Sequence, residues 1–344
     1  MYILIGFLRN FMLAILIAAW PAFAGGQGAL EKRDVHVAVG GKASLYYLPL
    51  TIAEQLGYFK EEGLNLTISD FAGGSQALRA VVGGSADVVS GAYEHTLNMQ
   101  PKGQYLQCFV QQGRAPQIAI GIASARARDY KSPKDLKGLK VGVSAPGSST
   151  HMILNHFIST DGLKPSDISV IGVGLGGAAI TALKSGQIDA VSNTDPVMTK
   201  LEQDGDVKIV ADTRTLRGTE QALGGPMPAG CLYAPVDFIR KNPNTVQALT
   251  NAIVRADRWI QSASPQDLLR TVPESYLLAD KALYLFSFNK VKEAISPDGV
   301  ISDAGARTAL KVIPTFNPEV KAKEIKLELT YTNEFVRKAN AKYK

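Results

Sequence analysis

Apolar and polar positions alternate along this chain in a way that predicts helices and strands in turn. Over residues 72–90 a glycine-rich turn is followed by apolar residues at helical spacing. A Gly-Gly pair at Gly83 ends the helical pattern, and a buried strand opens at Val88. Ser75 is of a residue type favoured at a helix N-cap. The pattern therefore predicts a loop, a helix capped by Ser75, and a strand.

The same unit occurs a second time. With a shift of 102 residues, the segment 176–192 aligns with 74–90 and repeats seven of its seventeen residues. Background composition would give roughly one or two matches. The matching pairs include Asp87 with Asp189 and Ser90 with Ser192. The sequence therefore predicts one structural unit present in each half of the chain.

Upstream of both copies the strand and helix patterns also correspond. Each half has the order strand, loop, helix, strand, loop, helix, strand, which predicts an α/β fold with two similar lobes, each a mostly parallel sheet flanked by helices. Helical spacing from Asn244 onward predicts C-terminal helices packed on the first lobe. The turn at 113–116 and the strand at 231–234 are the expected crossings. We assign 34–118 plus 231–344 to lobe 1 and 119–230 to lobe 2.

The first residues are expected to lie outside this fold. Arg9 is the only charge in residues 1–24, an apolar run follows it, and Ala22 to Ala24 form a small-x-small cleavage pattern. We predict a signal peptide cleaved after about Ala24 and a periplasmic protein. A retained membrane span is the weaker interpretation, and a start at Met12 or elsewhere stays open.

Charge and cysteine content exclude some functions and leave others open. The net charge is +6 over 344 residues, with scattered Lys and Arg, so nucleic-acid binding is not expected. Cys108 and Cys231 fit either a disulfide or two buried thiols. The His spacing supports no metal site, and we expect no cofactor. Residues 172–177 match a dinucleotide-binding pattern, but a lone match is weak and the first half lacks it.

Four loops are candidates for a ligand site because each precedes a predicted helix at the carboxyl end of a strand. Ligands of open α/β sheets bind there, and helix N-termini favour anions. Each loop taken alone is more simply explained by ordinary helix capping. Together they predict a site between the lobes. The loops are 41–47, 73–76, 145–151 and 174–178.

Two further groups of side chains adjoin these loops. Glu94 and His95 follow the first repeated strand and could form an acid–base pair, but no nucleophile motif accompanies them, so polar residues at a cleft edge are the favoured interpretation. Tyr46, Tyr47 and Tyr93 fit equally well as aromatic cleft walls or as packing between loops.

Several segments of the chain resemble a known family of binding proteins. The segment 48–64, with an apolar helix, Gly-Tyr-Phe, acidic residues and Gly-Leu, resembles periplasmic binding proteins of ABC importers for sulfonates, taurine, nitrate and thiamine pyrimidine precursors. Segments 132–142 and 183–190, followed by Asp195-Pro196, are similar to the same group. The resemblance implies two lobes joined by a hinge that close on a small solute, as in type II periplasmic binding proteins. It also implies delivery of the solute to a permease with an ATPase in the inner membrane.

On this basis we expect a monomeric, non-catalytic protein that binds a small anionic or zwitterionic solute. Glu94 departs from the group's pattern, because a carboxylate at the cleft would repel a purely anionic ligand. A pyrimidine-precursor enzyme or binding protein of this fold, or a ligand-presenting sensor domain, stays open. The expected ligand-binding residues are Lys42, Ser44, Tyr46, Tyr47, Gly74, Ser75, Tyr93, Glu94, Arg114, Ser148, Ser149, Thr150, Gly176 and Asp195.

Overall fold

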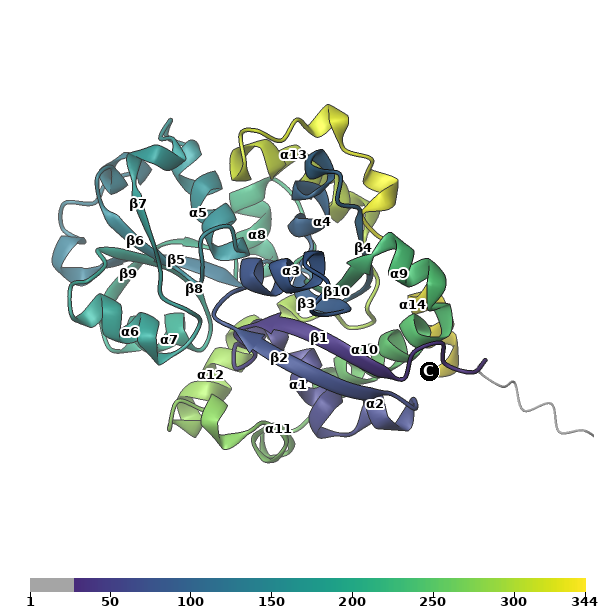
Figure 1. The fold of residues 1–344 in the computed structure, drawn as a ribbon. Helices are drawn as coiled ribbons and strands as arrows, with labels where there is room; N and C mark the ends of the chain where they lie inside the picture. The colour runs from purple at the N-terminus through teal and green to yellow at the C-terminus, as the bar shows by residue number, and fades with distance from the viewer. Residues whose placement is uncertain (1–27) are drawn as a thin grey trace, which may run out of the picture.

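A computed structural model describes residues 28–344 and contains two sheets of five strands, each covered by helices (Figure 1). We call the first sheet with its helices the first lobe and the other the second lobe. The first sheet consists of β1 (Asp34–Gly40), β2 (Asn65–Phe71), β3 (Val88–Ala92), β4 (Leu106–Gln111) and β10 (Gly230–Pro235). The second consists of β5 (Ile118–Ala123), β6 (Lys140–Val143), β7 (Ser169–Gly172), β8 (Ala190–Thr194) and β9 (Val207–Asp212).

The two sheets have the same topology. The strand order is β2-β1-β3-β10-β4 in the first and β7-β6-β8-β5-β9 in the second. The first three strands of each order run parallel, whereas the fourth, β10 or β5, is antiparallel to both of its neighbours. The expectation of two similar lobes with mostly parallel sheets is confirmed. Each sheet is mixed because its fourth strand comes from the part of the chain that crosses between the lobes.

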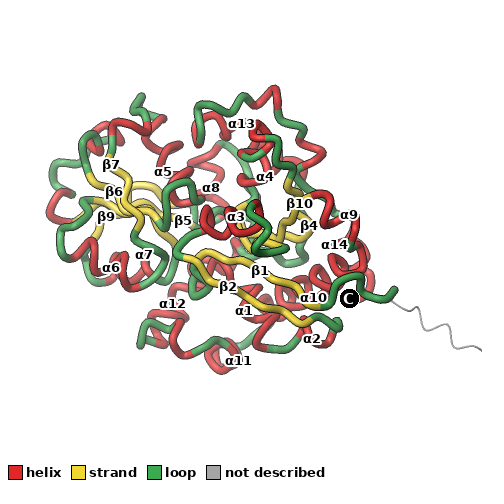
Figure 2. Tube along the Cα trace, viewed as in Figure 1, coloured by secondary structure: helices red, strands yellow, loops and turns green. Residues whose placement is uncertain are grey.

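Helices alternate with the strands and continue alone after β10, as the tube coloured by secondary structure shows (Figure 2). Those before β10 are α1 (Leu48–Gln55), α2 (Tyr58–Glu61), α3 (Gly74–Val82), α4 (Glu94–Asn98), α5 (Ser149–Ser159), α6 (Gly177–Lys184), α7 (Val197–Gln203) and α8 (Leu216–Leu223). Those after it are α9 (Val236–Lys241), α10 (Pro243–Ser262), α11 (Pro265–Thr271), α12 (Lys281–Val291), α13 (Asp303–Phe316) and α14 (Glu334–Lys342).

The repeated aspartates have the same structural role in both lobes. Asp87 accepts a hydrogen bond from the backbone N–H of His36 at 2.9 Å, and its own N–H donates to the His36 carbonyl at 2.8 Å. Asp189 makes the equivalent pair of bonds with Lys140, at 2.9 and 2.7 Å. Each aspartate thus ties the start of its strand to the neighbouring parallel strand, which explains why this residue recurs in the repeat.

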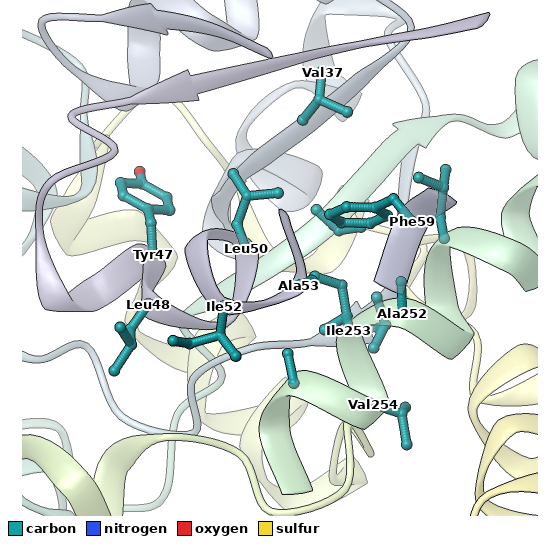
Figure 3. Packing of buried hydrophobic residues seen from close by; sticks show 14 of the residues in the cluster. Val37, Tyr47, Leu48, Leu50, Ile52, Ala53, Phe59, Ala252, Ile253 and Val254 are labelled. Atoms are coloured by element: carbon teal, nitrogen blue, oxygen red, sulfur yellow. The ribbon is translucent and has the colours of Figure 1, made fainter. Parts of the chain in front are cut away.

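One part of the core of the first lobe lies between its sheet and α10. The apolar face of α1 packs between them: Leu50 and Ala53 lie between Val37 of β1 and Ile253 of α10 (Figure 3). All four side chains are fully buried. This packing holds the loop before α1 firmly at the carboxyl end of β1, where a ligand site is expected.

Among the C-terminal helices, α10 and α14 pack on the first lobe, and others also contact the second lobe. On α5 of the second lobe, the Asn155 amide donates to the Phe316 carbonyl of α13 at 3.0 Å, and His156 Nδ1 lies 2.8 Å from Thr315 Oγ1. On the other side, Lys290 of α12 forms an ion pair with Glu202 of α7 at 2.6 Å. The helical periodicity that predicts these helices shows that one face is buried but not which partner buries it.

The chain crosses between the lobes where one strand belongs to the first sheet and the next belongs to the second. β4 ends at Gln111 in the first sheet and β5 begins at Ile118 in the second, and the chain returns with β10. The exact division at 118/119 and 230/231 stays a prediction. Cys108 and Cys231 lie on the adjacent strands β4 and β10 and are both buried free thiols.

The predicted signal peptide and cleavage site lie outside the described residues. Between residues 28 and 344, none of the helices has both the length and the apolar character needed to cross a membrane.

Candidate functional site

A small cavity lies between the two lobes at the carboxyl ends of their parallel strands. Its volume is about 20 Å³. All four loops singled out in the sequence reach it, and residues from both lobes line it. The lining residues are Tyr46, Tyr47, Gly74, Ala92, His95, Ile118, Ser144, Ser148, Ser149, Thr150, Leu175 and Thr194. A space of this size holds about one water molecule, so the lobes are closed on each other.

Backbone and hydroxyl groups join the lobes on one side of the cavity. The Ser44 hydroxyl lies 2.7 Å from Thr194 Oγ1, and the Leu45 N–H donates to the Asp195 carbonyl at 3.0 Å. Ser44 also caps the short helical turn 45–47 by accepting from the Tyr46 N–H at 3.2 Å. The loop after β1 is therefore both ordered in itself and bonded to the end of β8.

Ser75 and Ser148 join the lobes on the other side. The Ser75 N–H donates to Ser148 Oγ at 3.0 Å, and the Ser75 hydroxyl donates to the Pro146 carbonyl at 2.9 Å. The N-cap of α3 is Gly73, and Ser75 lies inside the helix without capping it, so the prediction of a Ser75 cap is wrong. Gly73 lies where the backbones of the two lobes come close together, because a Cβ added there would lie 2.8 Å from Ala145 Cβ in the other lobe.

Glu94 is a buried carboxyl group beside the cavity. It lies at the start of α4 in the first lobe, and its Oε1 accepts a hydrogen bond from the Ser149 hydroxyl at the start of α5 in the second. Its Oε2 is buried and has no hydrogen-bond partner among residues 28–344. Burial raises the pKa of Glu94 to about 7, and the bond from Ser149 partly offsets this rise.

His95 and Tyr46 present further unpaired polar atoms at this place. His95 Nδ1 lies 2.9 Å from the Tyr233 hydroxyl, whereas its Nε2 is buried without a partner in the described part of the chain. Burial lowers the pKa of His95 to about 4, so the ring is neutral at neutral pH. The Tyr46 hydroxyl is likewise buried and unpaired within this range. The site thus combines a carboxyl group with neutral donors and acceptors.

Neither of the two expected cationic residues lies at the cavity. Lys42 forms an ion pair with Glu54 of α1, and its side chain is only 13% exposed. Arg114 is exposed and donates from Nε to the Glu293 carbonyl at 2.9 Å, in the segment that crosses between the lobes. None of the lining residues is Lys or Arg. Within residues 28–344, the structure therefore brings no Lys or Arg side chain into the lining of this site.

Three other expected residues also lie away from the cavity lining. The Tyr93 hydroxyl lies 2.6 Å from Thr330 Oγ1, on the opposite side of the strand end. Asp195 is buried against the Arg214 guanidinium, with 3.6 Å between Oδ2 and Nη1. Gly176 is the N-cap of α6, with nothing within 4 Å of a Cβ built there.

Two lining residues that sequence reasoning missed could have been found from the repeat. Ala92 and Thr194 end β3 and β8, occupy equivalent positions in the two copies, and both line the cavity. Because alternate residues of a strand point to opposite sides, the next positions, Tyr93 and Asp195, face away. Ile118, at the crossing, carried no such signal.

No metal centre is evident in the described region: no group of three or more His, Cys, Asp or Glu side chains between residues 28 and 344 is arranged to hold an ion. His151 Nδ1 accepts a hydrogen bond from the Gly147 N–H at 3.0 Å, and His156 is bonded to α13 and to the Ala222 carbonyl.

Two lobes with the same sheet topology and a cavity between them define a periplasmic-binding-protein fold, and solved structures agree. A protein of Bordetella bronchiseptica RB50 is 58% identical, with a TM-score of 0.90 over 92% of this chain and 99% of that one. The alkanesulfonate-binding protein SsuA from Xanthomonas axonopodis pv. citri, bound to MOPS, is 20% identical (TM-score 0.66; 89% and 100% covered). The periplasmic nitrate-binding protein NrtA from Synechocystis PCC 6803 is 13% identical (TM-score 0.68; 92% and 90% covered).

The chain belongs to the NMT1/THI5-like family, whose model matches residues 44–266. YtlA of Bacillus subtilis (strain 168), named as a binding protein, is 22% identical over 264 residues, which is 76% of this chain and 77% of that protein. The 4-amino-5-hydroxymethyl-2-methylpyrimidine phosphate synthase of Schizosaccharomyces pombe is 27% identical over 218 residues, which is 62% of this chain. The match covers only 61% of the synthase.

Proposed function

We propose that this protein is the solute-binding component of an ABC importer. It captures a small organic solute between its lobes in the periplasm and delivers it to a permease and its ATPase in the inner membrane. The observation that carries the proposal is the convergence of four loops from two similar lobes on one cavity lined by hydroxyl groups, an imidazole and helix N-termini. Binding proteins of the same fold for alkanesulfonate and nitrate support it.

Binding rather than catalysis is favoured by the chemistry of the cavity. His95 is the only lining residue with an imidazole, and its ring faces the Tyr233 hydroxyl. Both cysteines are buried in the sheet pair β4 and β10. None of the residues that line the cavity is a cysteine, so no thiol nucleophile is exposed to a solute there. The relatives named as synthases make catalysis the alternative, which product analysis on any bound pyrimidine precursor would reveal.

Gly74 offers a direct test. It lines the cavity, and a Cβ added there would lie 3.5 Å from His95 Cε1 and 3.6 Å from the Tyr47 hydroxyl oxygen. These are ordinary contact distances, so Gly74→Ala should fold while its methyl group occupies the ligand space. The matched control is Gly176→Ala, because that Cβ meets nothing within 4 Å.

The experiment is a thermal-shift screen over sulfonates, small carboxylates, amino acids, nitrate and pyrimidines, together with mass spectrometry of small molecules that co-purify with the protein. A ligand at a hundredfold its dissociation constant adds about 2.7 kcal/mol of stability. We expect at least one solute to stabilise the wild type and Gly176→Ala but not Gly74→Ala. Equal stabilisation of all three proteins would place binding elsewhere and contradict the proposal.

A further inference from the structure

The charges around the cavity restrict which solutes it can hold. Lys42 is paired with Glu54, and Arg114 is bonded to the Glu293 carbonyl. Within residues 28–344, the Glu94 carboxyl is the one carboxyl group that forms a hydrogen bond with a lining residue, Ser149. A bare anion entering this site would therefore meet a carboxyl group and no cationic side chain.

One oxygen of this carboxyl group lacks a partner. Glu94 Oε1 is occupied by Ser149, whereas Oε2 is buried and makes no hydrogen bond with any described residue. Glu94 as a whole is 1% exposed, so solvent does not reach it in the closed form. A buried carboxyl oxygen of this kind is stabilised either by a proton or by a donor group from a ligand.

None of the groups that face Glu94 makes a hydrogen bond to its Oε2 in this structure. Tyr46 and Tyr47 come from the loop after β1, and Cys231 and Tyr233 from β10. All four have pKa values raised by burial and are neutral at neutral pH. His95, next to Glu94 on α4, is neutral as well. No side chain in this set carries a positive charge that would balance an ionised Glu94.

We infer that the cleft selects solutes that present a protonated amine or another N–H donor to Glu94 and discriminates against bare oxyanions. This rests on the proposed function and narrows its expected ligand from anionic or zwitterionic solutes to the donor-bearing ones. A donor from the ligand bonds to Oε2 and takes the place of the proton that closure otherwise requires. The N-terminus of α5, whose Ser149 and Thr150 line the cavity, can face an anionic group at the far end of a zwitterion.

Matched solutes of equal size test the inference. Taurine and 1-propanesulfonate differ by an ammonium group in place of a methyl group, and β-alanine and butyrate differ in the same way. We expect the amine-bearing member of at least one pair to bind the wild type at least tenfold tighter by calorimetry. Equal or tighter binding of the plain anions would overturn the inference, and so would a panel in which neither donor-bearing solute binds.

Glu94→Gln identifies the residue responsible. Gln keeps the shape and can still accept from Ser149, but it presents an NH₂ donor where the carboxylate presents an acceptor. We expect the preference for the amine to fall at least tenfold in this variant and to remain in the exposed control Glu324→Gln. An unchanged preference in Glu94→Gln would overturn the assignment to Glu94. The proposed function fails separately, if no solute of the wider screen distinguishes Gly74→Ala from Gly176→Ala.

Affinity measured against pH gives a second readout that a purely structural role would not produce. In the closed form the pKa of Glu94 is raised to about 7 by burial, so closure without a donor takes up a proton and weakens as pH rises through 7. A bound amine takes the place of that proton, so the preference for the amine over its plain partner should widen as the pH rises from 6 to 8, whereas in Glu94→Gln it should not change with pH. A flat profile in the wild type would contradict the inference.

Discussion

The backbone N–H of Ser75 donates to the hydroxyl oxygen of Ser148 at 3.0 Å, and the two residues belong to different lobes. The Ser148 hydroxyl in turn donates to Ser75 Oγ at 3.2 Å. The bond therefore forms only when the lobes are closed. Because the Ser75 N–H lies in the first turn of α3, where helices leave N–H groups unpaired, Ser148 completes that helix across the cleft.

The first prediction concerns this bond. Ser148→Ala leaves the Ser75 N–H without its partner in the closed form, so solute affinity should fall by about 1–3 kcal/mol while the fold is retained. Ser264→Ala is the matched comparison, because the Ser264 hydroxyl accepts from the Asp267 N–H at 3.1 Å at the start of α11, away from the cavity. It should lower the unfolding temperature instead. Calorimetry measures the affinity and thermal melts measure the unfolding temperature of each variant. Unchanged affinity in Ser148→Ala would show that Ser148 does not contribute to closure around the solute.

The second prediction concerns opening. A cavity of about 20 Å³ cannot admit an organic solute, so the lobes must separate and close again around it. Small-angle scattering should show a smaller radius of gyration when saturating solute is added. Gly74→Ala provides the control, since solute should leave its radius unchanged. An identical radius with and without solute in the wild type would contradict a closing cleft.

The two-lobed architecture could be predicted from the sequence because the chain contains an internal repeat, with one copy in each lobe. Asp87 and Asp189 match in the repeat because each makes the same hydrogen bond within its own lobe, so the residue is needed in both copies. Contacts between lobes have no such copy. Ser75 fits a helix cap by its residue type, but its hydroxyl bonds to Pro146 of the other lobe. Local patterns cannot show this, because the partner is set by how the lobes face each other.

Local patterns also cannot show where a long side chain ends, which is why the two cationic residues expected at the site, Lys42 and Arg114, are found away from it. Lys42 lies in a loop that reaches the cavity, but its four-carbon side chain extends to Glu54 on the next helix. Arg114 lies in the crossing segment, where the chain passes beside the carbonyl of Glu293. Sequence position gives the loop to which a residue belongs, whereas the direction of a long side chain depends on the nearest available partner.

The third prediction concerns Arg214, whose side chain is 1% exposed. It makes a two-bond contact with Asp212, at 2.9 and 2.6 Å, and lies near the buried Asp195. Arg214→Met leaves these carboxylates without their cation and should lower the free energy of unfolding by about 3–5 kcal/mol. Arg240→Met removes an exposed pair with Asp237 and should cost less than about 1 kcal/mol. Equal losses in urea denaturation would show that burial of the pair is unimportant.

The fourth prediction concerns Asp257, a fully buried residue of α10. Neither of its carboxyl oxygens has a hydrogen-bond partner in the described part of the chain. Burial raises its pKa well above the ordinary value, and the nearby Asp298 raises it further. The folded state therefore keeps a proton on Asp257 at pH values where the unfolded chain has lost it.

The sign of the pH dependence follows from this difference. Because the folded state binds the extra proton, each pH unit above the unfolded pKa, about 3.9, and below the folded one lowers stability by about 1.4 kcal/mol. Asp257→Asn removes the titrating group, so its advantage over the wild type should be smallest near pH 4 and grow as the pH rises toward 8. Urea denaturation at several pH values measures this. The exposed variant Asp237→Asn should run parallel to the wild type. If Asp257→Asn also ran parallel, the carboxyl group would have to be ionised or solvated in the folded protein.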